Sequence, residues 1–263
     1  MSTLKTIARN LLPSLLVQIS DTRKTFRSTS DRPWRDAFSY DKRVALIRSR
    51  FSILPEAFKR SPKFVIDVGA NEGQWIGSLL DLLTIPEVWI FEPNPAAMAA
   101  CRQRVGNRSG VRYFDAAVGE AAGQIELHIT GSSDHASVLQ PRAEFIGKHY
   151  SADAADVART IQVPLCTLDS IVPESQSIDL LKIDVQGFER AVLAGAQRVL
   201  VNTRAVLIEA NLQSHYVGDE LFPALWNQLA AAGFSLWSLS PPYLGAGGQA
   251  LWADAVFVRN ASI

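Results

Sequence analysis

Hydrophobic residues recur along the chain in two alternating patterns, short apolar runs and longer segments with helical spacing. The apolar runs are rich in β-branched residues and are flanked by turn-forming residues, which is typical of strands buried in a sheet. Strands are predicted at residues 63–68, 87–91, 111–114, 124–130, 161–166, 178–183, 205–209, 234–239 and 253–258. Helices are predicted at residues 74–83, 96–104, 187–200 and 221–232.

The order of these elements predicts the α/β fold class. Strands that alternate with helices are joined by right-handed crossovers and form a mostly parallel sheet, here of seven strands. The last two strands, at residues 234–239 and 253–258, follow each other without a helix and are expected to form an antiparallel hairpin at one edge. Residues 124–130 are expected to pair with residues 161–166. A chain of 263 residues favours one domain with additions of its own over two full domains.

Two segments do not follow the alternation. Residues 1–60 read as helical and polar-rich, and they are expected to form an N-terminal helical extension or cap before a domain at residues 61–263. Residues 131–160 are polar and small at first and then weakly helical. An insertion of this length in a compact domain is usually functional or mobile, so this segment is the predicted substrate loop.

An apolar run at residues 11–19 loosely imitates a signal peptide. Pro13, Ser14 and Gln18 interrupt the run, it is too short to span a bilayer, and no small-residue cleavage site follows it. It is therefore interpreted as an amphipathic helix that packs on the domain or on a partner, with peripheral membrane contact left open. No transmembrane segment is predicted.

Charge and cysteine content narrow the partners and the compartment. Lys plus Arg and Asp plus Glu each number 26, so no net positive field favours nucleic acid, and no nucleic-acid partner is expected. Cys101 and Cys166 have no ligand-like spacing, so they predict no metal site. This cysteine usage is typical of a reducing compartment, and a cytoplasmic location is expected. Whether the protein forms a homo-oligomer stays open.

The first strand of the predicted domain ends in a glycine-containing loop that begins with an acid. The residues predicted to bind a cofactor there are Asp67, Gly69, Ala70, Asn71, Glu72 and Gly73. A pyrophosphate loop needs a middle glycine where this chain has Asn71, and a neighbouring carboxylate would repel phosphates. The acid instead suits the ammonium and sulfonium charges of S-adenosylmethionine. The alternative is a tight strand-to-helix turn with a capping acid.

Polar residues also follow the next two strands. Glu92 ends the second strand, where its carboxylate can accept both ribose hydroxyls of an adenosine. Nicotinamide-binding proteins have an acid at this point too, so Glu92 predicts an adenosine nucleoside without naming the cofactor. Asp115 and Ala116 follow the third strand, where a carboxylate and backbone groups can read the adenine edge. Asp115 is equally explained as a turn former.

Asp184 follows an almost wholly apolar strand and is the leading candidate for catalysis. A partly desolvated carboxylate can serve as general base for a hydroxyl or as a metal ligand, whereas the plain alternative is that Asp184 only caps the next helix. His135, in the polar insertion, and Glu209, at the end of the fifth buried strand, are the further catalytic candidates. A metal bridged by Asp184 and Glu209 is the weaker alternative, because no compact ligand triad is visible. Lys182 and Glu189 are each explained as members of a structural ion pair. The residues expected to line an acceptor pocket behind Glu209 are Asn211, Gln213, His215 and Tyr216.

Taken together, these motifs resemble the FkbM family of S-adenosylmethionine methyltransferases. The resemblance rests on residues 64–73 (FVIDVGANEG), 91–95 (FEPNP), 116–119 (AAVG), 167–169 (TLD) and 181–189 (LKIDVQGFE). It implies a Rossmann-like class I methyltransferase fold and O-methylation of hydroxyls on sugars, glycolipids, polysaccharides or polyketide-type natural products. By position it implies a cofactor loop at residues 67–73, a ribose acid at Glu92 and the post-strand carboxylate at Asp184. Gln186 departs from the family, which more often has Glu there, so any charge contributed by that Glu is in doubt here.

Residues 240–243 (SPPY) match a signature of amino-group methyltransferases. In the unpermuted chain order that signature follows the fourth strand, a place already occupied by Asp184 and the residues after it, so residues 240–243 are interpreted as a turn before the terminal hairpin. Two other functions remain open on the sequence. An NAD(P)-dependent oxidoreductase is disfavoured by the missing second glycine, and a non-catalytic Rossmann-like binding protein is disfavoured by the intact acids.

Overall fold

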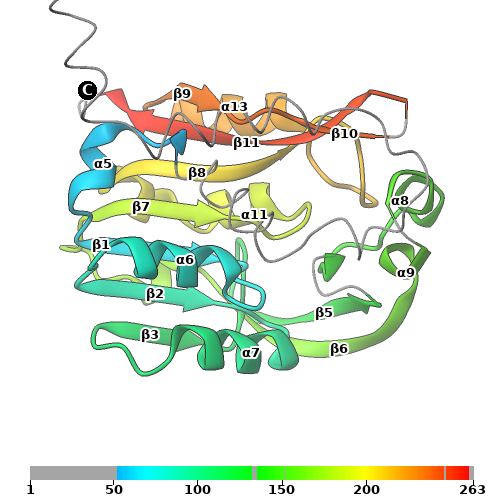
Figure 1. Ribbon diagram of the computed structural model, residues 1–263, viewed down its shortest axis with the longest axis horizontal. Helices are drawn as coiled ribbons and strands as arrows, with labels where there is room; N and C mark the ends of the chain where they lie inside the picture. The colour runs from blue at the N-terminus through cyan, green and yellow to red at the C-terminus, as the bar shows by residue number, and fades with distance from the viewer. Residues whose placement is uncertain (1–51, 132–134, 151, 246, 261–263) are drawn as a thin grey trace, which may run out of the picture. The chain divides into compact units, whose positions relative to one another are not determined.

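An eight-stranded sheet forms the centre of the structure, a computed structural model that describes residues 52–131, 135–150, 152–245 and 247–260 (Figure 1). Its strands lie in the order β10-β11-β8-β7-β1-β2-β3, and β9 also pairs with β11. They are β1 (Phe64–Val68), β2 (Glu87–Phe91), β3 (Val111–Phe114), β7 (Ile178–Ile183), β8 (Thr203–Asn211), β9 (Phe234–Leu239), β10 (Tyr243–Leu244) and β11 (Ala250–Arg259). The predicted apolar helix at residues 11–19, and most of the N-terminal extension, lie outside the described residues.

The sheet confirms the predicted fold class. β1 pairs in parallel with β2 and β7, and the parallel set extends to β3 and β8. β11 runs antiparallel to both β8 and β9, which confirms the hairpin expected at one edge. The strand beyond the seven predicted is β10, which pairs with β11 through Tyr243 and Leu244. Two residues are too few to show a periodic pattern, so the sequence did not predict it.

A second, three-stranded sheet branches from the chain after β3. It has the order β4-β6-β5, with β4 at Ala117–Val118, β5 at Gly123–Thr130 and β6 at Val157–Cys166. β5 and β6 pair antiparallel along their whole length, which confirms the pairing expected for these segments. Because the ladder ends at Thr130 opposite Val157, the insertion begins and ends at neighbouring points.

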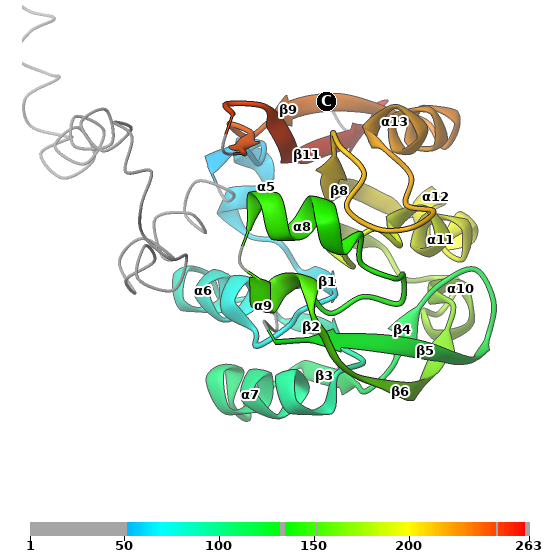
Figure 2. The ribbon, with the colours of Figure 1, turned by 90° about the vertical axis from the view of Figure 1, so that its right-hand side faces the viewer.

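Helices cover both faces of the main sheet, as Figure 2 shows. On one face lie α5 (Glu56–Arg60), α6 (Gln74–Leu82) and α7 (Pro95–Val105), and on the other lie α10 (Leu168–Ile171), α11 (Glu189–Ala194), α12 (Gln197–Val201) and α13 (Phe222–Ala231). The insertion carries α8 (Ala143–His149) and α9 (Ala152–Ala155). Local sequence explains the start of α7, because the Asn94 side chain accepts the Ala96 N–H and proline occupies the first helical turn. None of the helices in the described part of the chain has both the length and the apolar surface needed to cross a bilayer.

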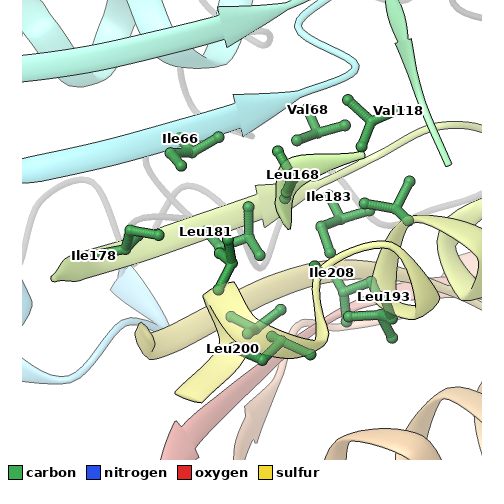
Figure 3. Close-up of a cluster of buried hydrophobic side chains, with 14 of the residues drawn as sticks. Ile66, Val68, Val118, Leu168, Ile178, Leu181, Ile183, Leu193, Leu200 and Ile208 are labelled. Atoms are coloured by element: carbon green, nitrogen blue, oxygen red, sulfur yellow. The ribbon is translucent and has the colours of Figure 1, made fainter. Parts of the chain in front are cut away.

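Two apolar cores hold these layers together, one on each face of the sheet. Figure 3 shows part of the first, in which Ile66, Leu181 and Ile208 from three adjacent strands meet Leu193 and Leu200 from α11 and α12. All five side chains are almost completely buried. Truncating one such side chain to alanine typically costs about 2–5 kcal/mol of stability. The strands that carry the candidate catalytic acids are therefore firmly anchored.

The prediction of a single helix at residues 187–200 is wrong. The structure has two short helices there, with a break at Gly195 and Ala196. A Cβ at Gly195 would lie 1.9 Å from the carbonyl oxygen of Gly119, so the backbone of the loop after β4 lies directly against this turn. The first helix also starts later than expected, because the Glu189 carboxylate accepts backbone N–H groups of the preceding loop. Hydrophobic spacing carries no signal for either contact.

The order of the strands identifies where a ligand is expected to bind. After β3 and the second sheet, the chain crosses to β7 on the other side of β1, so the strand order reverses at β1. In open α/β sheets, ligands bind beyond the carboxyl ends of the strands at this reversal. In Figure 1 the arrows of the parallel strands point toward α8 and α9, and Figure 2 views the domain from that end.

Candidate active site

The loop after β1 is held against the ends of both neighbouring strands. The backbone N–H groups of Gly69 and Ala70 donate to the Phe91 carbonyl at the end of β2, at 2.9 and 3.1 Å. Gly69 has a φ of +77°, and a Cβ there would lie 1.9 Å from the carbonyl oxygen of Asp184. Only glycine fits, so this loop and the loop after β7 lie in direct backbone contact. The predicted cofactor loop and the leading catalytic candidate are thus neighbours.

Asp67 is completely buried at the end of β1. Its Oδ1 accepts a hydrogen bond from Lys182 Nζ at 3.0 Å, and the same ammonium lies 3.5 Å from Asp184 Oδ2. Lys182 therefore joins the acid of the first loop to the acid after β7, and it belongs to an ion pair as expected. Glu189, the other residue expected in an ion pair, instead accepts the N–H groups of Val185 and Gly187. Burial raises the pKa of Glu189 to about 7.

Glu92 organises the ends of β1 and β2 through both of its carboxylate oxygens. Oε2 accepts the N–H of Asn71 and Oε1 accepts the N–H of Asn94, each at 2.8 Å. Asn71 has a φ of 50°, a left-handed conformation that asparagine tolerates better than most residues. Desolvation by burial raises the pKa of Glu92 to about 7, although the two backbone bonds oppose that shift. Each carboxylate oxygen has more than one lone pair, so these bonds are compatible with further hydroxyl donors.

The remaining residues predicted to bind the cofactor border this loop. A Cβ at Gly73 would lie 2.7 Å from the sulfur of Cys101, so Gly73 lets the loop pack against α7. The Glu72 carbonyl accepts from Arg104, also on α7. Asp115 is exposed and forms a 2.6 Å ion pair with Arg102 of α7. Ala116, beside it, is half-buried.

Gln186 brings the two predicted catalytic carboxylates together. Its Nε2 donates to Asp184 Oδ1 at 3.0 Å and to Glu209 Oε1 at 2.9 Å. The Tyr216 hydroxyl donates to Gln186 Oε1 at 2.8 Å, and the Ser137 hydroxyl donates to the Gln186 carbonyl at 2.7 Å. Gln186 has a φ of 56°, a strained value for this residue type that these bonds help to hold. The family departure noted in the sequence is therefore the centre of the polar network.

The same network bears on the metal alternative. Within the described ranges, no group of three or more His, Cys, Asp or Glu side chains is arranged to hold a metal ion. Between Asp184 and Glu209 lies the amide nitrogen of Gln186, which is a hydrogen-bond donor and not a cation ligand. One amide group therefore joins the two acids, and the metal alternative stays a prediction.

His135 lies close enough to Asp184 for that carboxylate to act on its imidazole electrostatically. Burial lowers the pKa of His135 to about 4, and the Asp184 charge only partly opposes this. The ring makes an edge contact with Tyr150, with centroids 5.0 Å apart. The buried Nδ1 has no hydrogen-bond partner among the residues the structure describes. His135 is therefore neutral near pH 7 and can accept a hydrogen bond from a hydroxyl.

Sequence reasoning missed several residues of this site. It treated Gln186 only as a departure from the family, and it did not single out Ser137 or Tyr150. The place of Gln186 between the two candidate acids depends on the left-handed turn after β7, which leaves no signal in hydrophobic spacing. Tyr150 carried no signal, because its place depends on how the insertion folds. Tyr216 was expected to line an acceptor pocket, and it does contact the polar network.

A separate surface hollow lies at the opposite end of the sheet. It is lined by residues from the amino ends of β1, β2 and β3, among them Lys63, Glu87 and Arg112. Ligands of open α/β sheets bind at the carboxyl ends of the strands. The hollow contains none of the predicted cofactor or catalytic residues, so it is a poorer candidate for the active site.

Comparisons with known proteins identify the family of the chain. Residues 67–236, well over half of the chain, match the family described as "Methyltransferase FkbM domain". The chain is 27% identical over 222 residues to the 2-O-methyltransferase NoeI of Sinorhizobium fredii (strain NBRC 101917 / NGR234), covering 81% of this chain and 85% of that protein.

Two solved structures are also similar. The methyltransferase FkbM of Methylobacillus flagellatus KT is 16% identical to this chain, with a TM-score of 0.45. The match covers 74% of this chain and 43% of the Methylobacillus chain, so this chain spans less than half of that protein. The magnesium protoporphyrin IX methyltransferase of Synechocystis PCC 6803 is 9% identical with a TM-score of 0.48, covering 97% and 99% of the two chains. On the match over residues 67–236, the chain belongs to the FkbM family of S-adenosylmethionine-dependent methyltransferases.

Proposed function

We propose that this protein transfers the methyl group of S-adenosylmethionine to a hydroxyl group of a sugar or other polyhydroxylated acceptor. The observation that carries this function is the pair of carboxylates, Asp184 and Glu209, joined by Gln186 beside the loop after β1. An acid at this point is suited to receive the proton that a hydroxyl must lose. The similarity to a protein named as a 2-O-methyltransferase supports oxygen as the methylated atom.

The residues at the ends of β1 and β2 fit a sulfonium nucleoside. The Glu92 carboxylate is held in place by the N–H groups of Asn71 and Asn94, so it is oriented before any ligand arrives. A carboxylate oriented in this way suits the two ribose hydroxyls. Gly69, Ala70 and the backbone up to Gly73 would border the methionine part. Asp115 and Ala116 would contact the adenine edge.

Asp67 has a different task in this proposal. It is fully buried and bonded to Lys182, so it acts on the nucleoside through the shape and charge of the loop. Lys182 lies against Asp184 as well, which fixes the position of the acid relative to the loop. When bound, the cofactor supplies an electrophilic methyl group. The chain's own part is to hold the acceptor oxygen in line with that methyl.

The catalytic roles in this proposal follow from where the proton of the acceptor hydroxyl goes. As the new C–O bond forms and the methyl–sulfur bond breaks, the acceptor hydroxyl releases its proton to Asp184. Neutral His135 accepts a hydrogen bond from the same or a neighbouring hydroxyl and so helps to orient the acceptor. Glu209 orients Asp184 through Gln186.

Calorimetry and a transfer assay test this function together. S-adenosylhomocysteine should bind the full-length protein, NADH should not, and Glu92→Gln should weaken the nucleoside without unfolding the chain. Transfer of labelled methyl from S-adenosylmethionine should then be measured to glycoside hydroxyls and, for comparison, to primary amines. Binding of NADH in preference to the sulfur nucleoside would overturn the assignment, as would transfer to amines alone.

A further inference from the structure

One peptide group after β7 is held at both ends by side chains from different segments of the chain. The Gln186 carbonyl accepts the Ser137 hydroxyl at 2.7 Å. The N–H of the same peptide, which belongs to Gly187, donates to Glu189 Oε1 at 3.2 Å. Ser137 lies in the insertion, whereas Glu189 is the first residue of α11. We call Ser137 and Glu189 the peptide clamp.

Glu189 is a buried acid whose hydrogen bonds go to the backbone of this turn. The residue is only 2% exposed. Its Oε1 also accepts the Val185 N–H at 3.0 Å, and the backbone N–H of Glu189 itself is a further donor. Burying a carboxylate is costly unless hydrogen bonds offset the lost hydration, and burial raises the pKa of Glu189 to about 7. The acid kept at this cost holds the N–H groups of the residues before and after Gln186.

Ser137 is itself fixed by the second sheet. The residue is almost completely buried, and its backbone exchanges two hydrogen bonds with His128 of β5, at 2.8 and 3.1 Å. Its hydroxyl oxygen also accepts the Leu139 N–H at 3.0 Å. His135, two residues earlier, lies near Asp184. Ser137 therefore connects the second sheet and the insertion to the turn after β7.

The clamped turn has a backbone conformation that needs support. The φ of Gln186 is 56°, a value that is unfavourable for a residue with a side chain, and the φ of Gly187 is 98°. A Cβ at Gly187 would lie 2.8 Å from Cδ2 of Tyr216, so the turn packs directly on that ring. This backbone conformation sets the direction of the Gln186 side chain, whose amide bonds both Asp184 and Glu209.

We propose that the peptide clamp holds the Gln186 amide between Asp184 and Glu209 and so sets the geometry of Asp184 toward the acceptor hydroxyl. This inference rests on the proposed function, in which Asp184 takes the proton. Ser137 and Glu189 act through Gln186, so they are positioning residues and not catalytic ones. Because they hold opposite ends of one peptide, the loss of either frees it, and their effects should not add.

Hydrogen exchange of the Gln186 side-chain amide tests the clamp without any acceptor. It is followed by NMR on the full-length protein, with and without S-adenosylhomocysteine, and the amide resonances are assigned by their absence in Gln186→Glu. In Ser137→Ala and in Glu189→Ala these protons should exchange roughly fivefold to tenfold faster than in wild type, about the effect of one net hydrogen bond. Glu189→Gln keeps a side-chain oxygen that can accept, so it should change the exchange less than Glu189→Ala. The double variant Ser137→Ala/Glu189→Ala should exchange little faster than Glu189→Ala alone.

Turnover separates positioning from a general loss of stability. With an acceptor identified by the transfer assay, Ser137→Ala should lower kcat roughly threefold to tenfold, the range for one neutral hydrogen bond, and leave the KM for S-adenosylmethionine unchanged. Ser238→Ala is the matched control, because the Ser238 hydroxyl on β9 also donates to a carbonyl, that of Ile53, at 2.7 Å. This control should leave both kcat and the Gln186 exchange unchanged.

Several outcomes would overturn the clamp. They are Gln186 exchange that is the same in wild type and Ser137→Ala, effects of the two substitutions that simply add, and an unchanged kcat in Ser137→Ala. If Glu189→Ala does not fold, Ser137→Ala and Glu189→Gln carry the comparison. Failure of the wild type to bind S-adenosylhomocysteine, with the exchange rates changing as expected, would instead overturn the proposed function.

Discussion

Lys182 Nζ lies 3.0 Å from Asp67 Oδ1, and the two residues face each other as register partners on β7 and β1. Both side chains are almost completely excluded from solvent, at 4% and 0% exposure. The contact joins the loop that would bind the cofactor to the strand that ends in Asp184. The ion pair is therefore both a structural element of the sheet and a link between the two halves of the site.

Removing the lysine should be costly to stability. Lys182→Met leaves the Asp67 carboxylate buried without its cation, and breaking a buried pair typically costs about 3–5 kcal/mol. Urea denaturation should show this loss, whereas Arg108→Met, which breaks an exposed pair with Asp81, should cost less than about 1 kcal/mol. Adding Asp67→Asn to Lys182→Met should recover much of the loss. A double variant no more stable than Lys182→Met would contradict the pairing.

Asp184→Asn should separate catalysis from cofactor binding. The amide keeps nearly the same shape but cannot take the hydroxyl proton, so kcat should fall roughly 100-fold or more, the usual scale for a general base. Calorimetry with S-adenosylhomocysteine should show unchanged affinity. Glu209→Gln is the comparison, because a residue that only orients Asp184 through Gln186 should lower kcat by a smaller factor. Full turnover in Asp184→Asn would remove this acid from the mechanism.

The raised pKa of Glu92 predicts a pH-dependent affinity for the nucleoside. With a pKa of about 7, Glu92 ionises as pH rises through neutrality, and the ionised carboxylate is the better acceptor for ribose hydroxyls. Affinity for S-adenosylhomocysteine, measured by calorimetry from pH 6 to pH 8, should increase and then level off. In Glu92→Gln the affinity should be lower, and this pH-dependent component should be absent.

The raised pKa of Glu92 also affects the stability of the ligand-free protein, which should decrease as pH rises. Because the folded pKa of Glu92 is raised from 4.5, its contribution to the free energy of unfolding is greatest below that value and is lost as pH rises toward 7. The pKa of Glu189 is also raised to about 7, so Glu189 adds a further loss of stability over the same pH range. Between pH 4.5 and 7, the melting temperature of the wild type should therefore fall more steeply than that of Glu92→Gln. The difference between the two slopes is the contribution of Glu92. Parallel curves would show that Glu92 titrates normally.

The break between α11 and α12 can be tested with one methyl group. Gly195→Ala places a carbon against the Gly119 carbonyl, at 1.9 Å in the present geometry, so the backbone must move and stability should fall by several kcal/mol, about the scale of core overpacking or more. Gly123→Ala is the control, since a Cβ at Gly123 meets nothing within 4 Å. Denaturant midpoints of the two variants give the comparison. Equal midpoints would mean that the two backbones separate without cost.

The parts of the fold that follow from local pattern were predictable. Apolar runs placed β1 and β2 within a residue of their observed bounds, because strands buried on both faces have little freedom in composition. Strand order then placed Asp184 and the loop after β1 at one edge. The roles assigned to these residues, and to Glu92, His135 and Glu209, remain predictions.

What the sequence could not show depends on contacts between distant segments. Gln186 joins Asp184 and Glu209 only because its backbone adopts a left-handed turn that hydrophobic spacing does not encode. Tyr150 reaches Tyr243 only because the insertion folds back over the sheet edge. Break points such as Gly195 depend on how closely two backbones pass.

The antiparallel ladder between β5 and β6 has a practical consequence. Its last pair, Thr130 opposite Val157, closes the base of the insertion, so the intervening segment starts and ends at paired residues. A chimera that exchanges residues 131–156 for the equivalent stretch of a relative would keep every ladder pair and every acid at the ends of β1 and β2. Such a graft would replace His135 and Tyr150 together, and under the proposed function it should change the acceptor while leaving the affinity for S-adenosylmethionine unchanged.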